Sequence, residues 1–251
     1  FTPAEQLAIT NSRVDGLEAR LNNIEAGSFS ETTTASFGLD FYLGSTDDDD
    51  SVADDALTFG YSLGIGLNTS FTGEDSLDIT LDAGNVTEGV SEFDGNTTGD
   101  TLIVDGISYT FPVGDATVIV GDSTDGSALF TTACAYGGPS AMLDDCGNVS
   151  AGITGGEATV GASYDFGNGF TAATGFQTSS TTSGVFTDES ADAYAFNAAY
   201  TADSYGVSVT YSNVEATTDS GALTDEENTY TALNAYYTPE GSLPSISVGY
   251  E

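Results

Sequence analysis

The side chains best suited to chemistry in this sequence are carboxylates that recur at the polar positions of alternating segments. They are Asp40, Asp78, Asp82 and Asp165, each in a run where apolar and polar residues alternate. Such alternation puts every second side chain on the same face of a β-strand. Rings of carboxylates around a water-filled lumen attract cations and repel anions. Pore lining is our hypothesis for these four residues, and a solvated strand face without a special role is the alternative.

Two cysteines, Cys134 and Cys146, lie in the long segment 122–155 between two alternating runs. An even number of cysteines in an oxidising compartment favours a disulfide. By loop entropy such a bridge contributes about 3 kcal/mol. The segment is either a stapled surface loop or a constriction folded into the lumen, with Asp144 and Asp145 near its narrowest point.

A run of four aspartates, Asp47, Asp48, Asp49 and Asp50, is a candidate metal site. Carboxylate oxygens are the hard ligands that Ca²⁺ prefers, but the run lacks the spacing of an EF-hand loop. A solvated outer loop is the simpler interpretation. We therefore expect no cofactor, with Ca²⁺ on acidic loops as the one exception to test.

The composition argues against catalysis and against nucleic acid as a partner. The chain has 39 acidic residues, two basic residues and no histidine. Almost nothing is present that could neutralise phosphates. Without histidine, and with only two cysteines, the common zinc and Cys/His catalytic constellations are excluded. We expect a protein that is not an enzyme.

The body of the chain has the pattern of a series of β-strands. Residues 35–43 alternate apolar side chains with small or polar ones, and residues 57–68 do the same. Strict alternation of this length is typical of strands with one apolar and one polar face. It predicts eleven strands, at 33–43, 56–71, 76–84, 102–112, 115–121, 156–166, 169–178, 190–201, 205–215, 228–238 and 245–251.

A transmembrane barrel explains these strands better than a soluble β-sandwich, in which residues also alternate. No apolar run reaches the length of about 18 residues that a membrane helix needs, so only the strands of a closed barrel could cross a bilayer. The polar face consists of Gly, Ser, Thr, Asn and Asp, as a wet lumen requires. Aromatic residues near strand ends, and short connections alternating with long acidic ones, also fit a barrel. We expect an antiparallel transmembrane β-barrel over residues 28–251.

Residues 1–27 follow a different period and predict a short coiled coil. In a heptad register the apolar side chains form one seam, and both arginines of the chain stand where charges pair across helices. A pattern of arginine, apolar residues and glutamate occurs twice and resembles the signature of trimeric coiled coils. An amphipathic helix packed on its own domain is the alternative. The residues of the predicted trimer contact are Leu7, Arg13, Val14, Leu17, Glu18, Arg20, Leu21, Ile24 and Glu25.

Four short motifs in the first half of the chain resemble the porins of cyanobacterial outer membranes. They lie at 29–34, directly after the coiled coil, and at 67–75, 82–85 and 109–114. In that family, which is related to the OprB-like carbohydrate-selective porins, an S-layer-homology domain precedes the coiled coil. The resemblance implies a barrel of about 16 strands, of which about eleven lie in this chain, so we expect further strands after residue 251.

The resemblance also implies a location and partners. A porin of this kind lies in the outer membrane of a Gram-negative-type bacterium, as a homotrimer in contact with lipid. A domain preceding residue 1 would attach it to the periplasmic cell wall. The sequence departs from the family at Glu74, where a lysine is usual. The family's basic lumen residues are missing, so its usual selectivity does not carry over.

Together these features predict a porin that lets small hydrophilic solutes or ions diffuse passively. We expect it to prefer cations, because acidic residues so outnumber basic ones. An acidic, Ca²⁺-binding surface or fibre protein without channel activity is the main alternative. A secreted β-sandwich from a high-salt habitat would also explain the acidity.

Overall fold

The described residues of the computed structural model form eleven β-strands. The model describes residues 13, 32–45, 57–86, 95–134, 156–179, 190–217, 223–241 and 243–250. The strands are β1 (Thr33–Gly44), β2 (Thr58–Thr69), β3 (Ser76–Gly84), β4 (Ile103–Val113), β5 (Ala116–Asp122), β6 (Ala158–Gly167), β7 (Phe170–Thr178), β8 (Asp192–Thr201), β9 (Tyr205–Thr217), β10 (Leu223–Tyr237) and β11 (Ile246–Tyr250).

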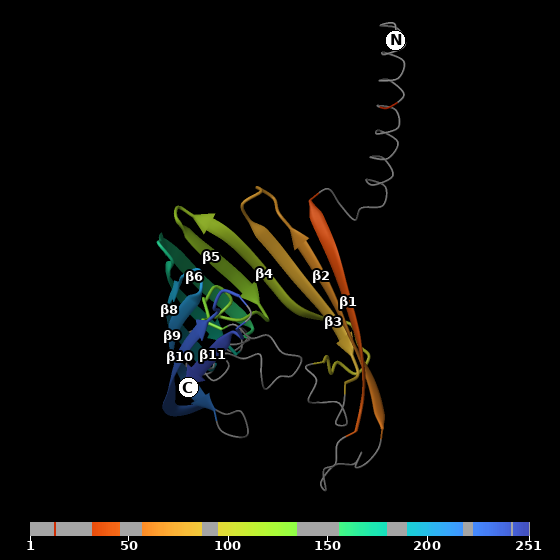
Figure 1. Ribbon diagram of the computed structural model, residues 1–251. Coiled ribbons are helices and arrows are strands. Elements are labelled where there is room, and N and C mark those ends of the chain that lie inside the picture. The colour runs from red at the N-terminus through yellow and green to blue at the C-terminus, as the bar shows by residue number, and fades with distance from the viewer. Residues whose placement is uncertain are drawn as a thin grey trace, which may run out of the picture.

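All eleven strands belong to one antiparallel sheet, in which each strand pairs with its neighbours in sequence (Figure 1). The predicted all-β, antiparallel fold is therefore confirmed. Strands β1 and β11 are the two edges of this sheet, so the described strands curve as a barrel wall that is not closed. The largest boundary difference is at β10, which begins at Leu223 and not at residue 228. Its pairing with β9 shifts between Leu223 and Glu227, and such an irregularity interrupts the period-2 pattern.

The two ends of the sheet differ in their connections. At one end, strands are joined by the turns 70–75, 114–115, 168–169 and 202–204, whereas longer connections leave β1, β3, β5 and β7 at the other. In the turn between β6 and β7, Gly167, Asn168 and Gly169 have φ values of 75°, 54° and 84°. Glycine adopts this left-handed region without penalty, and asparagine is among the next most tolerant residues. The predicted alternation of short and long connections holds as far as β9, but beyond it the order reverses, because connection 218–222 is shorter than connection 238–245.

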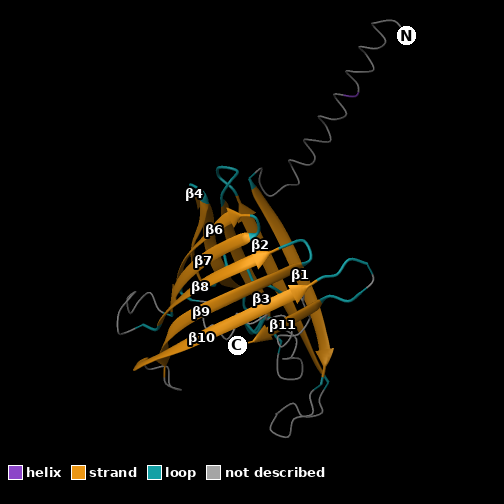
Figure 2. Cartoon of the chain, turned by 60° about the vertical axis from the view of Figure 1, so that its left-hand side comes forward, coloured by secondary structure: helices purple, strands orange, loops and turns teal. Residues whose placement is uncertain are grey.

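The two faces of the sheet are chemically opposite. On the outer face, large apolar side chains are exposed, with Phe37 at 74%, Phe41 at 64% and Phe59 at 62%. The Phe41 and Phe59 rings stack across β1 and β2 at 5.7 Å. The inner face, toward which the sheet curves (Figure 2), carries small and polar side chains. A water-soluble protein rarely exposes so large an apolar surface, whereas a barrel wall in lipid does.

The predicted coiled coil of residues 1–27 lies outside the described residues, apart from Arg13, which is helical and exposed. The trimer contact therefore stays a prediction. Within the ranges that the structure describes, no helix has the length and apolar character needed to cross a bilayer.

Candidate functional site

A segment of the chain crosses the inner face of the sheet directly after β5. Residues 123–134 run inside the curve of β6 to β9 (Figure 1). At β6, the Thr159 hydroxyl donates to the Thr124 carbonyl oxygen at 2.5 Å. Backbone N–H groups of the segment then donate to one side chain on each following strand. These bonds join Gly126 to Gln177 Oε1 (3.2 Å), Thr131 to Asn197 Oδ1 (3.1 Å) and Ala133 to Ser208 Oγ (2.9 Å).

Small residues on the inner face allow the segment to approach the strands closely. A Cβ added at Gly175 of β7 would collide with the carbonyl oxygen of Gly126. At β8, Ala195 has no exposed surface, and Phe130 of the segment packs against it. The backbones of Gly175 and Gly126 are in contact, and the Phe130 ring packs on the Ala195 methyl group. Small inward-facing residues on β7 and β8 therefore make room for the segment.

The structure bears on the two alternatives for segment 122–155. Residues 123–134 contact the inner wall and do not form a free surface loop. Asp144, Asp145 and Cys146 lie outside the described residues, so their place near a constriction stays a prediction. Cys134 is disulfide-bonded, and its predicted pairing with Cys146 remains an expectation.

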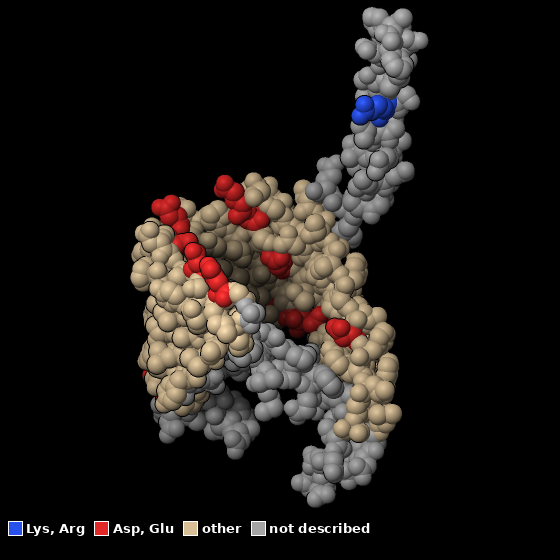
Figure 3. Space-filling view, viewed as in Figure 1, with Lys and Arg blue, Asp and Glu red and all other residues tan. Residues whose placement is uncertain are grey.

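The inner face of β1 to β3 is acidic, and Figure 3 shows acidic side chains within the hollow of the molecule. Three of the carboxylates singled out by the sequence share this face. Asp40 lies opposite Ser62, Asp78 opposite Asn68 and Asp82 opposite Gly64. The Asn68 amide and the Ser76 hydroxyl each donate to Asp78 at 2.6 Å, which fixes the orientation of that carboxylate.

Asp165, the fourth carboxylate, lies apart from these three. It stands opposite Thr171 near the end of β6, and its Oδ1 accepts a 2.8 Å hydrogen bond from the backbone N–H of Gly167. The carboxylate therefore holds the turn between β6 and β7. A further exposed carboxylate, Asp105, was not foreseen because it sits at a register shift in β4. The break in alternation at this point of the strand was the available signal.

The turn between β2 and β3 is organised by Asp75. Its Oδ1 accepts hydrogen bonds from the Ser70 hydroxyl (2.9 Å), the Phe71 N–H (3.0 Å), and the N–H and hydroxyl of Thr72 (both 2.7 Å). The Tyr109 hydroxyl on β4 donates to Oδ2 at 2.6 Å. This last bond, supported by the others, holds the pKa of Asp75 well below the usual carboxyl range. The motif at 67–75 thus builds a turn, a role that its Ser, Thr and Asp spacing could have suggested.

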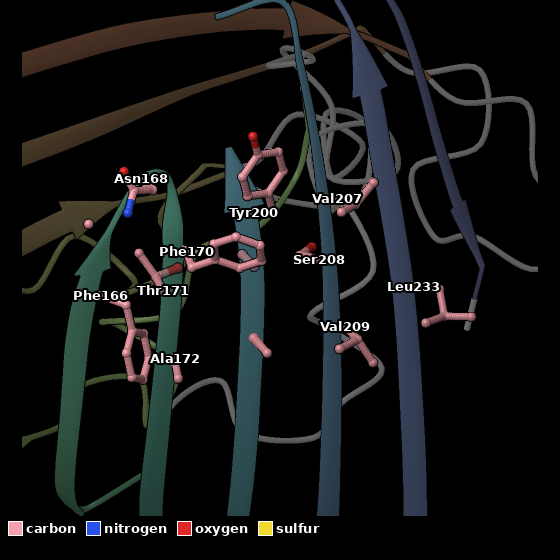
Figure 4. A pocket seen from close by; sticks show the side chains of 13 residues that line it. Phe166, Asn168, Phe170, Thr171, Ala172, Tyr200, Val207, Ser208, Val209 and Leu233 are labelled. Atoms are coloured by element: carbon pink, nitrogen blue, oxygen red, sulfur yellow. The ribbon is translucent and has the colours of Figure 1, made fainter. Parts of the chain in front are cut away.

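A shallow hollow of about 780 Å³ lies on the outer face beside the turn between β6 and β7 (Figure 4). Small side chains, Ala172 and Ala198, leave room between larger ones. The rings of Phe170 and Tyr200, 4.6 Å apart, stand at its rim. The hollow lies on the opposite side of the sheet from segment 123–134, so it is separate from the inner surface.

Among the residues that the structure describes, no group of three or more His, Cys, Asp or Glu side chains converges to hold a metal ion. The run Asp47, Asp48, Asp49 and Asp50 lies outside those residues, so Ca²⁺ binding there stays a prediction.

Comparison with known proteins supports the fold. Two solved variants of the porin of Rh. blastica match this chain with TM-scores of 0.53 and 0.52, at 13% identity, over 86% of this chain and 73% of the porin. An uncharacterised protein of Nostoc sp. is 31% identical over 135 residues, which is 47% of this chain. The chain spans about a quarter of that curated relative, since the match covers 24% of its length. No family model matches the chain.

The structural likeness, at this level of identity, concerns the fold. It agrees with three features described above: the antiparallel order of the strands, the exposed apolar outer face and the polar inner face. The described strands form the wall of an antiparallel β-barrel of the kind found in bacterial porins.

Proposed function

We propose that the protein is a channel through which small hydrophilic solutes or ions diffuse passively across an outer membrane. The observation that carries this proposal is the fixing of residues 123–134 across the inner wall. A segment held there narrows the inside of the barrel without filling it with apolar side chains. The inside of a soluble β-sandwich is a packed core of inward-facing apolar residues, whereas this inner face carries Asn, Ser, Thr and Asp.

We further propose that the channel prefers cations. Asp40, Asp78 and Asp82 share the inner face of β1 to β3. The two basic residues of the chain, Arg13 and Arg20, both precede β1, so no basic side chain of residues 28–251 opposes these carboxylates. A wall with one sign of charge raises the local concentration of the opposite ion.

The lengths of the connections between strands suggest how the barrel is oriented in the membrane. Outer-membrane barrels have short periplasmic turns and longer external loops, so we place the turns 70–75 and 168–169 in the periplasm. Residue 32 enters β1 at this same end. The proposed trimeric coiled coil of residues 1–27 would then project toward the cell wall. The sequence match to a Nostoc protein is consistent with a cyanobacterial outer membrane.

Reconstitution in a planar bilayer tests the channel. We expect stepwise increases in conductance, and a reversal potential of the sign that indicates cation selectivity under a salt gradient. An acidic fibre or surface protein would give no steps, which would refute the channel. Steps with an anion-selective reversal potential would refute only the cation preference.

A further inference from the structure

We propose a binding site for a hard divalent cation, Ca²⁺ or Mg²⁺, between Asp192 of β8 and Glu215 of β9. The site lies at the long-connection end of the sheet, away from the acidic inner face of β1 to β3. It involves none of the residues of segment 123–134 or of their anchors. It is therefore independent of the proposed channel.

Asp192 has one buried carboxylate oxygen, Oδ1, without a hydrogen-bond partner among the described residues. The residue is 9% exposed, and no donor among the described residues reaches its buried Oδ1. Removing a carboxylate from water is costly unless it is paired, hydrogen-bonded or bound to a metal. A buried carboxylate oxygen without a hydrogen-bond partner calls for a water or an ion.

A second carboxylate lies beside it. Ala193 and Val214 are paired across β8 and β9, and Asp192 and Glu215 are the next residues outward on these strands. The backbone N–H of Asp192 donates to Glu215 Oε2 at 3.0 Å, which places the two acids side by side.

A third carboxylate extends the row across the next strand. Glu215 stands directly opposite Glu227 of β10, so Asp192, Glu215 and Glu227 follow one another across three strands. Like charges directly opposite each other in an antiparallel sheet destabilise it. Glu227 is exposed, and its Oε2 accepts a 2.8 Å hydrogen bond from the Asn213 side-chain amide, so the need for a compensating positive charge is greatest at Asp192 and Glu215.

The chain itself cannot supply that charge in this region. Its two basic residues, Arg13 and Arg20, precede the first strand, and it has no histidine. The compensating charge must come from solution, as a proton or as a metal ion. A divalent ion offsets two neighbouring carboxylates at once, whereas a single proton offsets only one.

The ligand chemistry favours a hard cation. The acids offer oxygen only, without the imidazole or thiolate that zinc and copper favour. Mg²⁺ is commonly held by one or two carboxylates and several waters, and Ca²⁺ accepts a larger set of oxygen ligands. Thr178 lies opposite Asp192, and its hydroxyl is 2.6 Å from that of Ser190. Further oxygen atoms therefore adjoin the pair.

Thermal unfolding of the detergent-solubilised protein in Ca²⁺ and in EDTA tests the site, with Ca²⁺ affinity measured by calorimetry. The variants are Asp192→Asn and Glu215→Gln. The matched control is Asp203→Asn, an exposed acid in the turn at the other end of β8 and β9. Glu215→Gln retains a side-chain oxygen that can accept the bond from the Asp192 N–H, so it preserves the local geometry.

We expect Ca²⁺ to raise the unfolding midpoint of the parent protein and of the Asp203→Asn control. In both site variants most of this rise should be lost, and the affinity should fall at least about tenfold, since even outer-shell changes commonly cost that much. In EDTA the site variants should be as stable as the parent or more stable, because one repulsive charge is gone.

Two results would overturn the proposal. One is a full Ca²⁺-dependent rise in both variants, which would place the bound ions on other acids. The other is a parent protein that does not respond to Ca²⁺ while Asp192→Asn is stabilised equally in Ca²⁺ and EDTA, which would indicate a shared proton. If Asp192→Asn does not fold, the Glu215→Gln result decides.

Discussion

The inner face of β1 to β3 and the inner face of β6 to β9 differ in the residues that they carry and in what contacts them. On β1 to β3 the inner face carries Asp40, Asp78 and Asp82, and Asn96 contacts it by hydrogen bonds to Ser62 and Leu63. On β6 to β9 it is covered by segment 123–134, which is held by hydrogen bonds from successive strands. One half carries charge and the other carries a bound segment, which we propose to act as a constriction. The same alternating strand can serve either task, because the outward residues are apolar in both halves and only the inward residues differ.

The difference is clearest at inward-facing glycines. A Cβ at Gly38 of β1 would meet nothing within 4 Å, whereas one at Gly175 of β7 would collide with Gly126. We therefore expect Gly175→Ala to destabilise the folded protein by about 1–3 kcal/mol, the usual cost of overpacking. Gly38→Ala should change stability by less than about 0.5 kcal/mol. Chemical denaturation measures both, and equal effects would contradict the comparison.

If residues 123–134 narrow the pore, the same substitution should also change transport. Displacement of the segment by Gly175→Ala should raise the single-channel conductance, while Gly38→Ala should leave it near that of the parent. If Gly175→Ala destabilises the protein but conductance stays normal, the packing contact is supported and the constriction is refuted.

The two halves also differ in how their turns are held. Asp75 accepts hydrogen bonds from four residues, whereas Asp165 accepts a hydrogen bond from the backbone of Gly167. We expect Asp75→Asn to lower the unfolding midpoint clearly at neutral pH, and Asp165→Asn to lower it little. Loss of similar size in both would show that the turns are equivalent.

The Asp75 effect should depend on pH in a defined direction. Because its pKa is lowered in the folded protein, its contribution is fully present above the unfolded carboxyl pKa of about 3.9. The contribution is lost as the pH falls from there through the lowered folded value. The difference in midpoint between parent and Asp75→Asn should therefore shrink below about pH 4. A difference that is constant between pH 7 and pH 3 would contradict this.

A pair of asparagines sharpens the comparison further. Asn197 on the covered half accepts the N–H of Thr131 and donates to Thr210 at 2.9 Å, while Asn68 on the open half is exposed. Replacing Asn197 by Ala leaves buried groups unpaired and should cost about 1–3 kcal/mol. Asn68→Ala also removes a hydrogen bond, to Asp78, but at a solvent-exposed site where water can replace it, so it should cost less, about 1 kcal/mol or below. The free energy of unfolding of each variant, measured by denaturant titration, tests this difference, and equal losses would contradict it.

The smallest expected effect concerns selectivity. Asp78→Asn removes one of three inner carboxylates and should shift the reversal potential modestly toward zero. Asp78→Glu, which keeps the charge, should leave the potential near its parent value. If both variants behave alike, the charge of this residue does not contribute to selectivity.

Alternation along the chain was sufficient to predict the eleven strands, because each strand has one apolar and one polar face over most of its length. It failed where the ladder is irregular. The start of β10 near Leu223 and the place of Asp105 in β4 both coincide with register shifts. A bulge changes which face a residue occupies, so a period-2 pattern cannot be followed through it.

The anchors of segment 123–134 could not be predicted from local pattern. Gln177, Asn197 and Ser208 look like ordinary polar positions of their strands, and their partners lie 51, 66 and 75 residues away. Asp192 was missed for another reason. It is one of 39 acidic residues, and its burial together with its unpartnered Oδ1 is visible only in the structure.

Nearest-neighbour pairing sets an order of events during assembly. Each strand of the sheet needs only the next strand along the chain, so the wall can grow hairpin by hairpin with little loss of chain entropy at each step. The segment after β5 is different, because Ala133 reaches Ser208 across 75 residues. It can be fixed in place only once β9 exists. A wall that has formed as far as β5 must therefore pass through a stage in which its inside is still wide.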